Sequence, residues 1–251
     1  MNNIFPEEYF MDQQDLKVFI PIVAGLIGFL VFWFAQQSES LKQKFKNRYP
    51  KEKGEANHIL YTRYLGGISM GIIPALLYLI FIRGSTLREL GVVWENNAIL
   101  RVILWSLVII SIIVPLVYFN AKKPKNLLLY PQIRKEYWNK KLIWSNFLSW
   151  GAYLLGYEIL FRGVLLFPLV TVIGIWPAIA VNIGLYSVTH IPKGLTETIG
   201  AIPLSVLLCL LCINIGNLWP AFLIHIAIAW TNTWVSLRHN PAMRITKTTS
   251  P

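Results

Sequence analysis

Seven apolar runs divide this chain, and their lengths limit how it can fold more than any other feature. They cover residues 18–35, 65–82, 99–119, 142–173, 178–190, 199–215 and 218–237. A helix rises 1.5 Å per residue, so about 20 apolar residues cross the roughly 30 Å of hydrocarbon in a bilayer. The run 142–173 is long enough for one tilted helix or for a helix followed by a short broken one. We therefore predict an all-α polytopic transmembrane protein with about seven to eight spans.

Composition supports a membrane protein and argues against a nucleic-acid-binding one. Of the 251 residues, 55% are hydrophobic and 14% are charged, and the mean hydropathy is +0.52, which soluble domains of this length do not show. The net charge of +11 comes mostly from two basic blocks between apolar runs, at 41–53 and 121–141. The positive-inside rule accounts for such blocks, so we expect a lipid bilayer and no nucleic acid as partner.

The order of charges around the first run predicts the topology. Glu7, Glu8, Asp12 and Asp15 precede the run and the basic block 41–53 follows it, which is the reverse of a cleavable signal peptide. We predict an N-terminus outside and a cytoplasmic C-terminus, and the lack of an organelle-targeting sequence favours a bacterial inner membrane. We divide the chain into N-terminal transmembrane helices and basic loops (1–141), core helices (142–240) and a polar tail (241–251).

Several polar residues interrupt the late apolar runs. Glu158 and Arg162 lie four residues apart, on one face of a helix, where they can form a charge-assisted pair. His190 ends the fifth run and His225 lies in the seventh; Glu197 and Asn232 add further polar groups. An intramembrane ionisable residue costs a few kcal/mol on insertion scales, so each of these residues needs a partner or a function.

Two structural explanations stay open beside a functional one. Glu158 and Arg162 can be an ion pair that only makes insertion tolerable. A buried histidine is often a hydrogen-bonded structural residue. Histidine and glutamate are also zinc ligands, but the HExxH spacing is absent, so we expect no cofactor and keep zinc as the weaker alternative.

Three motifs in order carry a resemblance to a known family. They are YEILFR at 157–162, YSVTH at 186–190 and HIAIA at 225–229. This order resembles the EExxxR, FxxxH and HxxxN motifs of the CPBP (CAAX protease and bacteriocin-processing) family of intramembrane endopeptidases. The FRG at 161–163, the WPA at 176–178 and the GNLWPAFLIH at 216–225 also look like that family. The resemblance covers about residues 140–237.

The resemblance implies a CAAX-protease-like fold and a membrane protease. A glutamate and a histidine, here Glu158 and His190, would activate water to attack a peptide bond of a membrane-associated or lipidated peptide. His225, together with the asparagine of the family's third motif, would stabilise the oxyanion, and such stabilisation is usually a large contribution to the rate enhancement in this chemistry. Arg162 would hold the carboxylate's orientation and charge.

Two positions depart from the family's pattern. Tyr157 stands where the first glutamate of EExxxR is expected, and Ala229 stands where HxxxN has asparagine. A phenol is a poor base but can donate a hydrogen bond. Three explanations follow: Glu158 is itself the base, Glu197 in the loop after HIPKG replaces it, or catalysis is lost. In the last case the protein is a membrane binding, scaffolding or bacteriocin-immunity protein.

Overall fold

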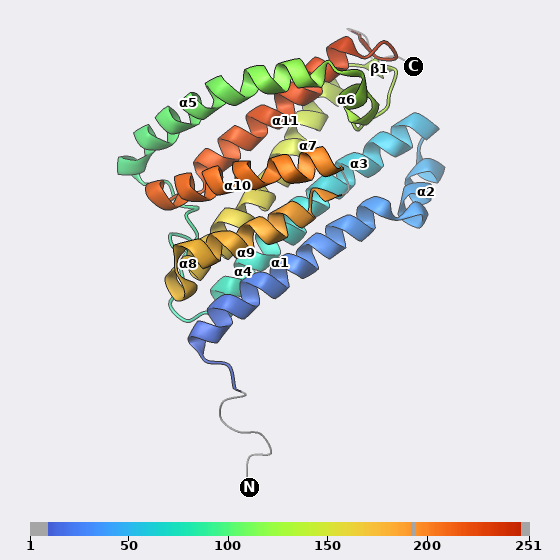
Figure 1. Cartoon of the computed structure of the whole chain (residues 1–251). Coiled ribbons are helices and arrows are strands. Elements are labelled where there is room, and N and C mark those ends of the chain that lie inside the picture. The colour runs from blue at the N-terminus through green and yellow to red at the C-terminus, as the bar shows by residue number, and fades with distance from the viewer. Residues whose placement is uncertain (1–9, 192–193, 247–251) are drawn as a thin grey trace.

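The computed structural model of the chain describes residues 10–191 and 194–246, and these are almost entirely helical (Figure 1). The elements are α1 (Gln13–Gln37), α2 (Glu39–Arg48), α3 (Lys51–Gly67), the π-helical turn η2 (Ile68–Ile72), α4 (Ile73–Phe81), α5 (Asn96–Ala121), α6 (Pro124–Leu129), β1 (Tyr137–Trp138), α7 (Lys140–Glu158), the π-helical turn η3 (Ile159–Leu166), α8 (Phe167–Ile173), α9 (Ile175–Val188), α10 (Leu195–Ile215), α11 (Trp219–His239) and β2 (Arg244–Ile245). The predicted all-α fold is confirmed.

Some residues named in the sequence analysis fall outside the described ones. They are Glu7 and Glu8, residues 192–193 of HIPKG, and residues 247–251 of the predicted polar tail. The described part of the tail contains β2, which pairs in parallel with β1 next to the start of α7. This pair ties the C-terminal segment to the loop that precedes the core helices.

Five helical stretches of the described chain are long and apolar enough to cross a membrane. They are 13–37, 52–81, 98–121, 140–173 and 197–215, and they correspond to the first, second, third, fourth and sixth apolar runs. The fifth run forms α9, which has 14 residues, and the seventh forms most of α11, which is not among the five stretches. The protein is an integral membrane protein, and the total of seven to eight spans stays a prediction.

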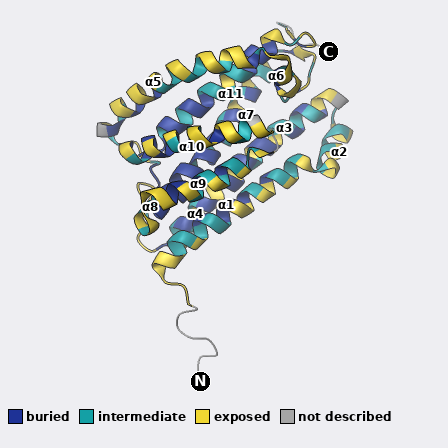
Figure 2. Cartoon of the chain, viewed as in Figure 1, coloured by how far each residue is buried: buried dark blue, intermediate teal, exposed yellow. Residues whose placement is uncertain are grey.

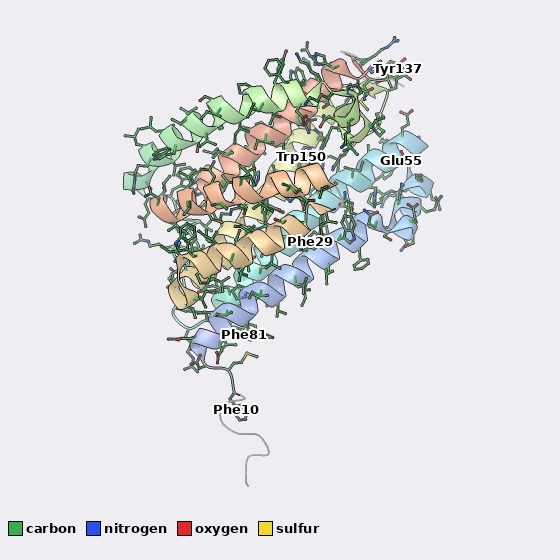
Figure 3. All side chains as sticks on the ribbon, in the orientation of Figure 1. Phe10, Phe29, Glu55, Phe81, Tyr137 and Trp150 are labelled. Carbon is green, nitrogen blue, oxygen red and sulfur yellow. The ribbon has the colours of Figure 1, made fainter. Side chains whose placement is uncertain are left out.

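Successive long helices run in alternating directions along the bundle (Figure 1). As a result α2, α6 and the C-terminal end of α11 gather at one end, whereas the N-terminal end of α1 lies at the other. Figure 3 places Glu55 and Tyr137 at the first end and Phe10 and Phe81 at the second. Both basic blocks therefore lie at one end of the bundle, which is the arrangement that the positive-inside rule requires.

The two basic blocks contain short helices that the sequence analysis treats as loops. Ser38 caps α2 by accepting a hydrogen bond from the backbone N–H of Leu41 at 3.2 Å. Lys46 and Arg48 lie in the last turn of α2, where cations are favoured by the helix dipole. In the second block, α6 begins at Pro124, a residue suited to a first helical position. The prediction of plain loops in these blocks is therefore wrong.

The continuous stretch α7–η3–α8 is the centre of the bundle. In its most apolar window 67% of the residues are buried within the protein, compared with 11% for α5. In Figure 2 the central stretch is largely dark blue, the colour of buried residues, whereas α5 at the edge carries many yellow, exposed residues. Apolar side chains exposed on α5 are suited to contact with lipid, whereas polar side chains on α7 and η3 need protein partners.

Helix α3 and the following η2 touch α7 backbone to backbone at three glycines. A Cβ atom on Gly156 would lie 2.6 Å from the Cα of Gly67, and one on Gly67 would lie 2.5 Å from the carbonyl oxygen of Ala152. Gly71 contacts Gly156 on the same face. Small residues allow such close approach in membrane helices, where packing rather than water drives association. This contact fixes α7 beside α3.

We expect Gly156→Ala to destabilise the protein because its new methyl group meets backbone that cannot move aside. Overpacking of this kind costs about 1–3 kcal/mol. Gly184→Ala is the matched control, since a Cβ at that helical position has nothing within 4 Å and alanine favours a helix over glycine. Thermal unfolding in detergent should show a lower midpoint for Gly156→Ala only. Equal midpoints would contradict the close contact.

Candidate functional site

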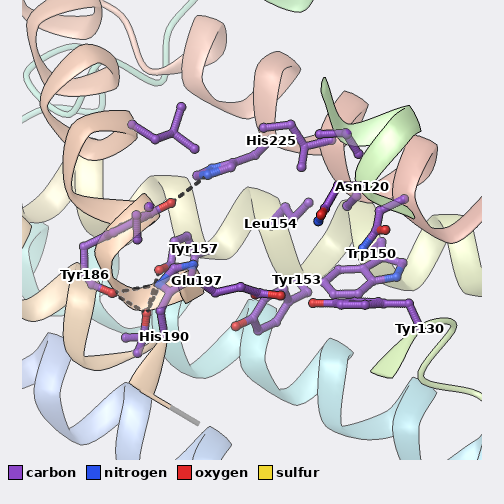
Figure 4. A pocket seen from close by; sticks show the side chains of 18 of the residues that line it. Asn120, Tyr130, Trp150, Tyr153, Leu154, Tyr157, Tyr186, His190, Glu197 and His225 are labelled. Atoms are coloured by element: carbon purple, nitrogen blue, oxygen red, sulfur yellow. Dashed lines mark hydrogen bonds between the residues drawn. The ribbon is translucent and has the colours of Figure 1, made fainter. Parts of the chain in front are cut away.

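A cavity of about 400 Å³ lies among α5, α7, α9, α10 and α11 (Figure 4). Aromatic side chains form much of its wall, including Tyr130, Trp150 and Tyr153. The polar groups on the wall come from several helices far apart in sequence: Tyr157, Tyr186, Thr189, His190, Glu197, His225, Asn120, Asn126 and Asn232. A mostly apolar cavity with a few convergent polar groups is the usual form of a binding or active site.

The Glu158–Arg162 pair lies behind this wall, at the junction of α7 and η3. Both side chains are 0% exposed, and the Nη1 of Arg162 lies 3.4 Å from the Oε2 of Glu158. Arg162 also contacts the Oγ of Ser205 at 3.4 Å and lies over the ring of Tyr186. The predicted i, i+4 pair therefore forms, and it forms in a π-helical segment of the kind that is frequent at functional sites.

Glu158 also binds His225, which the spacing of the sequence does not reveal. Its Oε1 accepts a hydrogen bond from the Nδ1 of His225. Because a carboxylate only accepts, Nδ1 carries the proton, and in the neutral ring Nε2 accepts the hydroxyl of Tyr186 at 2.8 Å. Both ring nitrogens of His225 are thus engaged. A carboxylate in this position fixes the tautomer and orientation of an imidazole.

His190 lies just past the end of α9, on the cavity wall. Its Nδ1 lies 3.0 Å from the carbonyl oxygen of Tyr186 and 3.2 Å from the Oγ1 of Thr189. The carbonyl only accepts, so Nδ1 is the protonated nitrogen and Nε2 carries the lone pair of the neutral ring. His190 is therefore oriented to act as a hydrogen-bond acceptor or base at the cavity.

Tyr157 and Glu197 complete this side of the cavity. The hydroxyl of Tyr157 lies 2.8 Å from the Oγ1 of Thr189, the same threonine that contacts His190. Glu197 belongs to the first turn of α10, so its assignment to a loop is wrong. Helix α10 begins after Gly194, whose φ of +97° marks a sharp change of direction. Figure 4 shows the Glu197 side chain pointing into the cavity towards Tyr153.

Asn232 lines the cavity two turns after His225 on α11, and Ala229 lies between them on the wall. The Oδ1 of Asn232 accepts a hydrogen bond from the Nδ2 of Asn126 at 3.0 Å. This contact fixes the orientation of the amide of Asn232 and identifies its Nδ2 as the remaining donor. An asparagine is therefore present at the cavity one helical turn beyond the position of the expected one.

The structure thus brings all seven predicted site residues into one region but separates them into two groups. Tyr157, His190, His225, Glu197 and Asn232 line the cavity, whereas Glu158 and Arg162 support it from behind. Sequence reasoning missed Asn120 and Asn126, and it placed Tyr186 in a motif without giving it a role. No sequence signal marked the two asparagines, because Asn120 directly precedes the basic block 121–141 and Asn126 lies in it, with no visible periodicity.

Potential metal ligands occur at this site only in small numbers. Across residues 10–191 and 194–246, no three His, Cys, Asp or Glu side chains gather as a group that could hold a metal ion. Among the described residues, a zinc ion at this site would find its protein ligands in pairs, such as Glu158 with His225.

Comparison with known proteins connects this region to one family. Residues 139–231, from the start of α7 into α11, match the family model described as type II CAAX prenyl endopeptidase Rce1-like. The resemblance drawn from the three motifs is confirmed over this segment. The chain matches no curated protein and no solved structure. The family match supports a function of the protease type.

Proposed function

From the Rce1-like character of residues 139–231, we propose that this protein is an intramembrane endopeptidase that cleaves membrane-associated or lipidated peptides. One observation carries the proposal: two histidines and a carboxylate, His190, His225 and Glu197, line one cavity inside a membrane bundle. A cavity of about 400 Å³ admits a short extended peptide segment, and its aromatic wall suits apolar side chains or a lipid group.

Glu197 is the residue that we propose as the base. It is the one carboxylate on the cavity wall among the described residues, and His190 lines the same cavity. A water held by these two groups gives a proton to Glu197 as its oxygen bonds to the peptide carbonyl carbon. The carbonyl oxygen becomes an oxyanion, the C–N bond then breaks, and the proton passes to the departing amine.

Asn232 is the donor that we propose for the oxyanion. Its Nδ2 is oriented by the hydrogen bond from Asn126 to its Oδ1, and preorganised donors cost no reorganisation during reaction. In this proposal Glu158 and Arg162 are positioning residues, because they hold His225 without reaching the cavity. Tyr157 positions Thr189, which in turn contacts His190.

The proposal also includes the substrate of the protein and the membrane in which it lies. The substrate is a peptide or protein held at the bilayer, and neither a nucleic acid nor a bound cofactor takes part. We propose the bacterial inner membrane, with the end of the bundle that carries both basic blocks in the cytoplasm. The cavity lies towards that end, since its wall includes Asn120 near the end of α5 and Asn126 in α6.

A second candidate function is that of a binding, scaffolding or bacteriocin-immunity protein without hydrolysis. Two observations favour it: Tyr157 occupies the place of the family's first glutamate, and Glu158 and both nitrogens of His225 are engaged with neighbours. The cavity would then bind a peptide and release it intact.

His190→Ala is expected to abolish peptide cleavage, because loss of general acid–base groups costs about 10²–10⁴-fold in rate. Purified protein in lipid vesicles would be given a library of prenylated and leader peptides, with products identified by mass spectrometry. His239→Ala is the matched control, since the Nδ1 of His239 contacts the carbonyl oxygen of Val235 at 2.8 Å, four residues before it, as His190 does with Tyr186.

Three outcomes of that screen separate the candidates. Cleavage lost in His190→Ala but retained in His239→Ala supports the protease. Binding without cleavage by the unaltered protein supports the second candidate function. Stoichiometric zinc in elemental analysis, together with activity sensitive to chelators, would replace the glutamate mechanism by a metal one.

A further inference from the structure

A second buried arginine, Arg63, lies outside the cavity of the candidate site and has no acidic partner. It is 3% exposed. Arg162, the other buried arginine of the described residues, is paired with Glu158. No aspartate or glutamate of the described chain forms an ion pair with Arg63. An unpaired ionisable residue inside a membrane bundle indicates a functional site.

Neutral side chains hold the Arg63 guanidinium in place. Its Nη1 donates to the Oδ1 of Asn146 at 2.8 Å and to the Oγ of Ser149 at 3.1 Å. Its Nη2 donates to the Oε1 of Gln132 at 2.9 Å, and the guanidinium carbon lies 4.1 Å from the centre of the Trp150 ring. These contacts fix the orientation of the guanidinium but contribute no negative charge.

Two buried nitrogen atoms of this cluster find no acceptor among the described residues. They are the Nε of Arg63 and the Nδ2 of Asn146. The Nη2 of Arg63 also keeps a second N–H beyond the one that Gln132 accepts. A buried donor without an acceptor destabilises a protein, so the group that is missing here is an acceptor. A negatively charged acceptor would also neutralise the arginine.

The contacts between α1 and the stretch α3–η2 place Arg63 near the end of the first apolar run, 18–35. The Nε2 of His58 lies 3.3 Å from the carbonyl oxygen of Ala35, and the Oγ of Ser69 donates to the carbonyl oxygen of Gly28 at 3.0 Å. The two stretches run in opposite directions (Figure 1), and Arg63 lies about midway between His58 and Ser69. Arg63 is therefore level with a point about one turn, roughly 5 Å, before the end of the run.

The neighbours of Arg63 also belong to the boundary between apolar helices and basic blocks. Gln132, which accepts a hydrogen bond from Arg63, lies in the basic block 121–141, and Arg63 itself precedes the apolar run 65–82. Phospholipid head groups lie at such a boundary, where apolar spans meet the basic segments on one side of the membrane. Because an arginine side chain is long enough to extend towards this level, the guanidinium lies within reach of a lipid phosphate.

Arg63 lines a second cavity, of about 210 Å³, between α1, α3 and α7. Along α1 the wall of this cavity changes from Phe32 and Trp33 to Gln36 and Gln37, towards the end of the bundle that carries both basic blocks. Arg63 is the one charged residue on this wall among the described residues. The order of apolar and then polar groups is that of a phospholipid, whose chains lie in the hydrocarbon and whose phosphate lies at the bilayer surface.

We propose that this second cavity binds the head group of an anionic phospholipid, with the lipid phosphate on the remaining N–H groups of Arg63. Guanidinium groups bind phosphate oxygens through two parallel hydrogen bonds, and Nε with Nη2 offers an edge of this kind. One phosphodiester charge matches the one cation of the wall. The described wall holds no carboxylate that could pair with the amine of a zwitterionic head group. The acyl chains lie along the exposed apolar face of α1, which includes Leu30 and Phe34.

The test measures lipid binding by the purified full-length protein in phosphate-free maltoside detergent. Phosphatidylglycerol, phosphatidylcholine, diacylglycerol, inorganic phosphate and a farnesylated tetrapeptide are added separately, and thermal midpoints are recorded over a concentration series. We expect phosphatidylglycerol to raise the midpoint most. Arg63→Gln should weaken its apparent affinity by about tenfold or more, since hydrogen bonds to charged groups have about this value. Arg48→Gln is the matched control, because it removes an exposed charge from the last turn of α2, at the same end of the bundle.

A second variant leaves Arg63 and its partners in place. Gln37 is exposed and lines the second cavity, so Gln37→Glu should leave the fold intact, repel the phosphate and weaken phosphatidylglycerol binding severalfold. Gln43→Glu, at an exposed position of α2, adds the same charge at the same end and should leave binding unchanged. This pair decides the question if Arg63→Gln does not fold. Diacylglycerol, which lacks phosphate, provides a further comparison with the unaltered protein, which it should stabilise less than phosphatidylglycerol does.

Several results would overturn the lipid site, and none of them depends on peptide cleavage. Equal stabilisation by diacylglycerol or by phosphatidylcholine would contradict an anionic phosphate. Phosphatidylglycerol binding that is unchanged in Arg63→Gln and Gln37→Glu would place the lipid elsewhere. An Arg63-dependent shift with inorganic phosphate that equals the shift with lipid would assign the site to a free anion.

The proposed substrate is the competing occupant, because Tyr130, Trp150, Tyr153 and Thr189 line both cavities. An Arg63-dependent shift with the farnesylated peptide and with none of the lipids would assign the second cavity to that substrate and overturn the proposal. No Arg63-dependent shift with any of these ligands would leave water as the partner of the unpaired donors, and this result also overturns it.

Discussion

Glu197→Gln is expected to lower kcat for peptide cleavage by about 10²–10⁴-fold while leaving the thermal midpoint nearly unchanged. The amide fills the same space in the first turn of α10 but cannot take a proton from water. Because Glu197 lines the cavity and forms no ion pair among the described residues, its charge contributes little to the fold. Single-turnover cleavage by purified protein in vesicles measures the effect.

The same substitution at Glu158 provides the decisive comparison. Glu158 is fully buried between Arg162 and His225, so Glu158→Gln should lower the thermal midpoint and reduce activity only through the position of His225. Glu39→Gln, at an exposed glutamate of α2, is the control for loss of one negative charge. If Glu158→Gln abolished cleavage in folded protein and Glu197→Gln did not, Glu158 would be the base and the role proposed for Glu197 would be wrong.

Arg162→Leu is expected to produce the largest loss of stability, about 3–5 kcal/mol, which is the usual effect of removing one partner of a buried ion pair. The substitution leaves the Glu158 carboxylate in the centre of the bundle with only His225 beside it. Thermal unfolding in detergent measures the loss. The double variant Arg162→Leu with Glu158→Gln should recover much of it, because no unpaired charge remains.

Equal destabilisation of the single and double variants would show that shape rather than charge matters at this position.

The structure also predicts the effect of exchanging the two charges of Glu158 and Arg162. An arginine at position 158 would face the Nδ1–H of His225, a donor, in place of the present acceptor. We therefore expect the exchanged variant, Glu158→Arg with Arg162→Glu, to unfold as readily as Arg162→Leu.

The helices could be predicted from sequence because each depends on a local signal. Apolar runs predicted the long helices, and the four-residue spacing predicted the Glu158–Arg162 pair, which the structure contains. Helix α10 was predicted to begin too late, at Ile199 rather than Leu195, because its first turn is polar and follows HIPKG. Helices α2 and α6 were not predicted because they are short and lie in the basic blocks, where no apolar run marks a helix.

The assembly of the site could not be predicted from sequence because it depends on contacts between distant helices. The bond between Glu158 and His225 joins residues 67 apart, and the bond between Asn126 and Asn232 joins residues 106 apart. Periodicity carries no information about which polar faces meet. The division into cavity-lining and supporting residues therefore came only with the structure, and it moved the role proposed for the base from Glu158 to Glu197.

The glycine contact between α3 and α7 has a consequence for the shape of both cavities. Trp150 and Tyr153 of α7 line the cavity of the candidate site and also the second cavity of about 210 Å³, whose wall includes Arg63 of α3. Because the backbones of α3 and α7 meet at Gly67 and Gly156 with no room for a side chain, the distance between these two helices is fixed. A substitution that separated the helices would therefore change the size of both cavities at once.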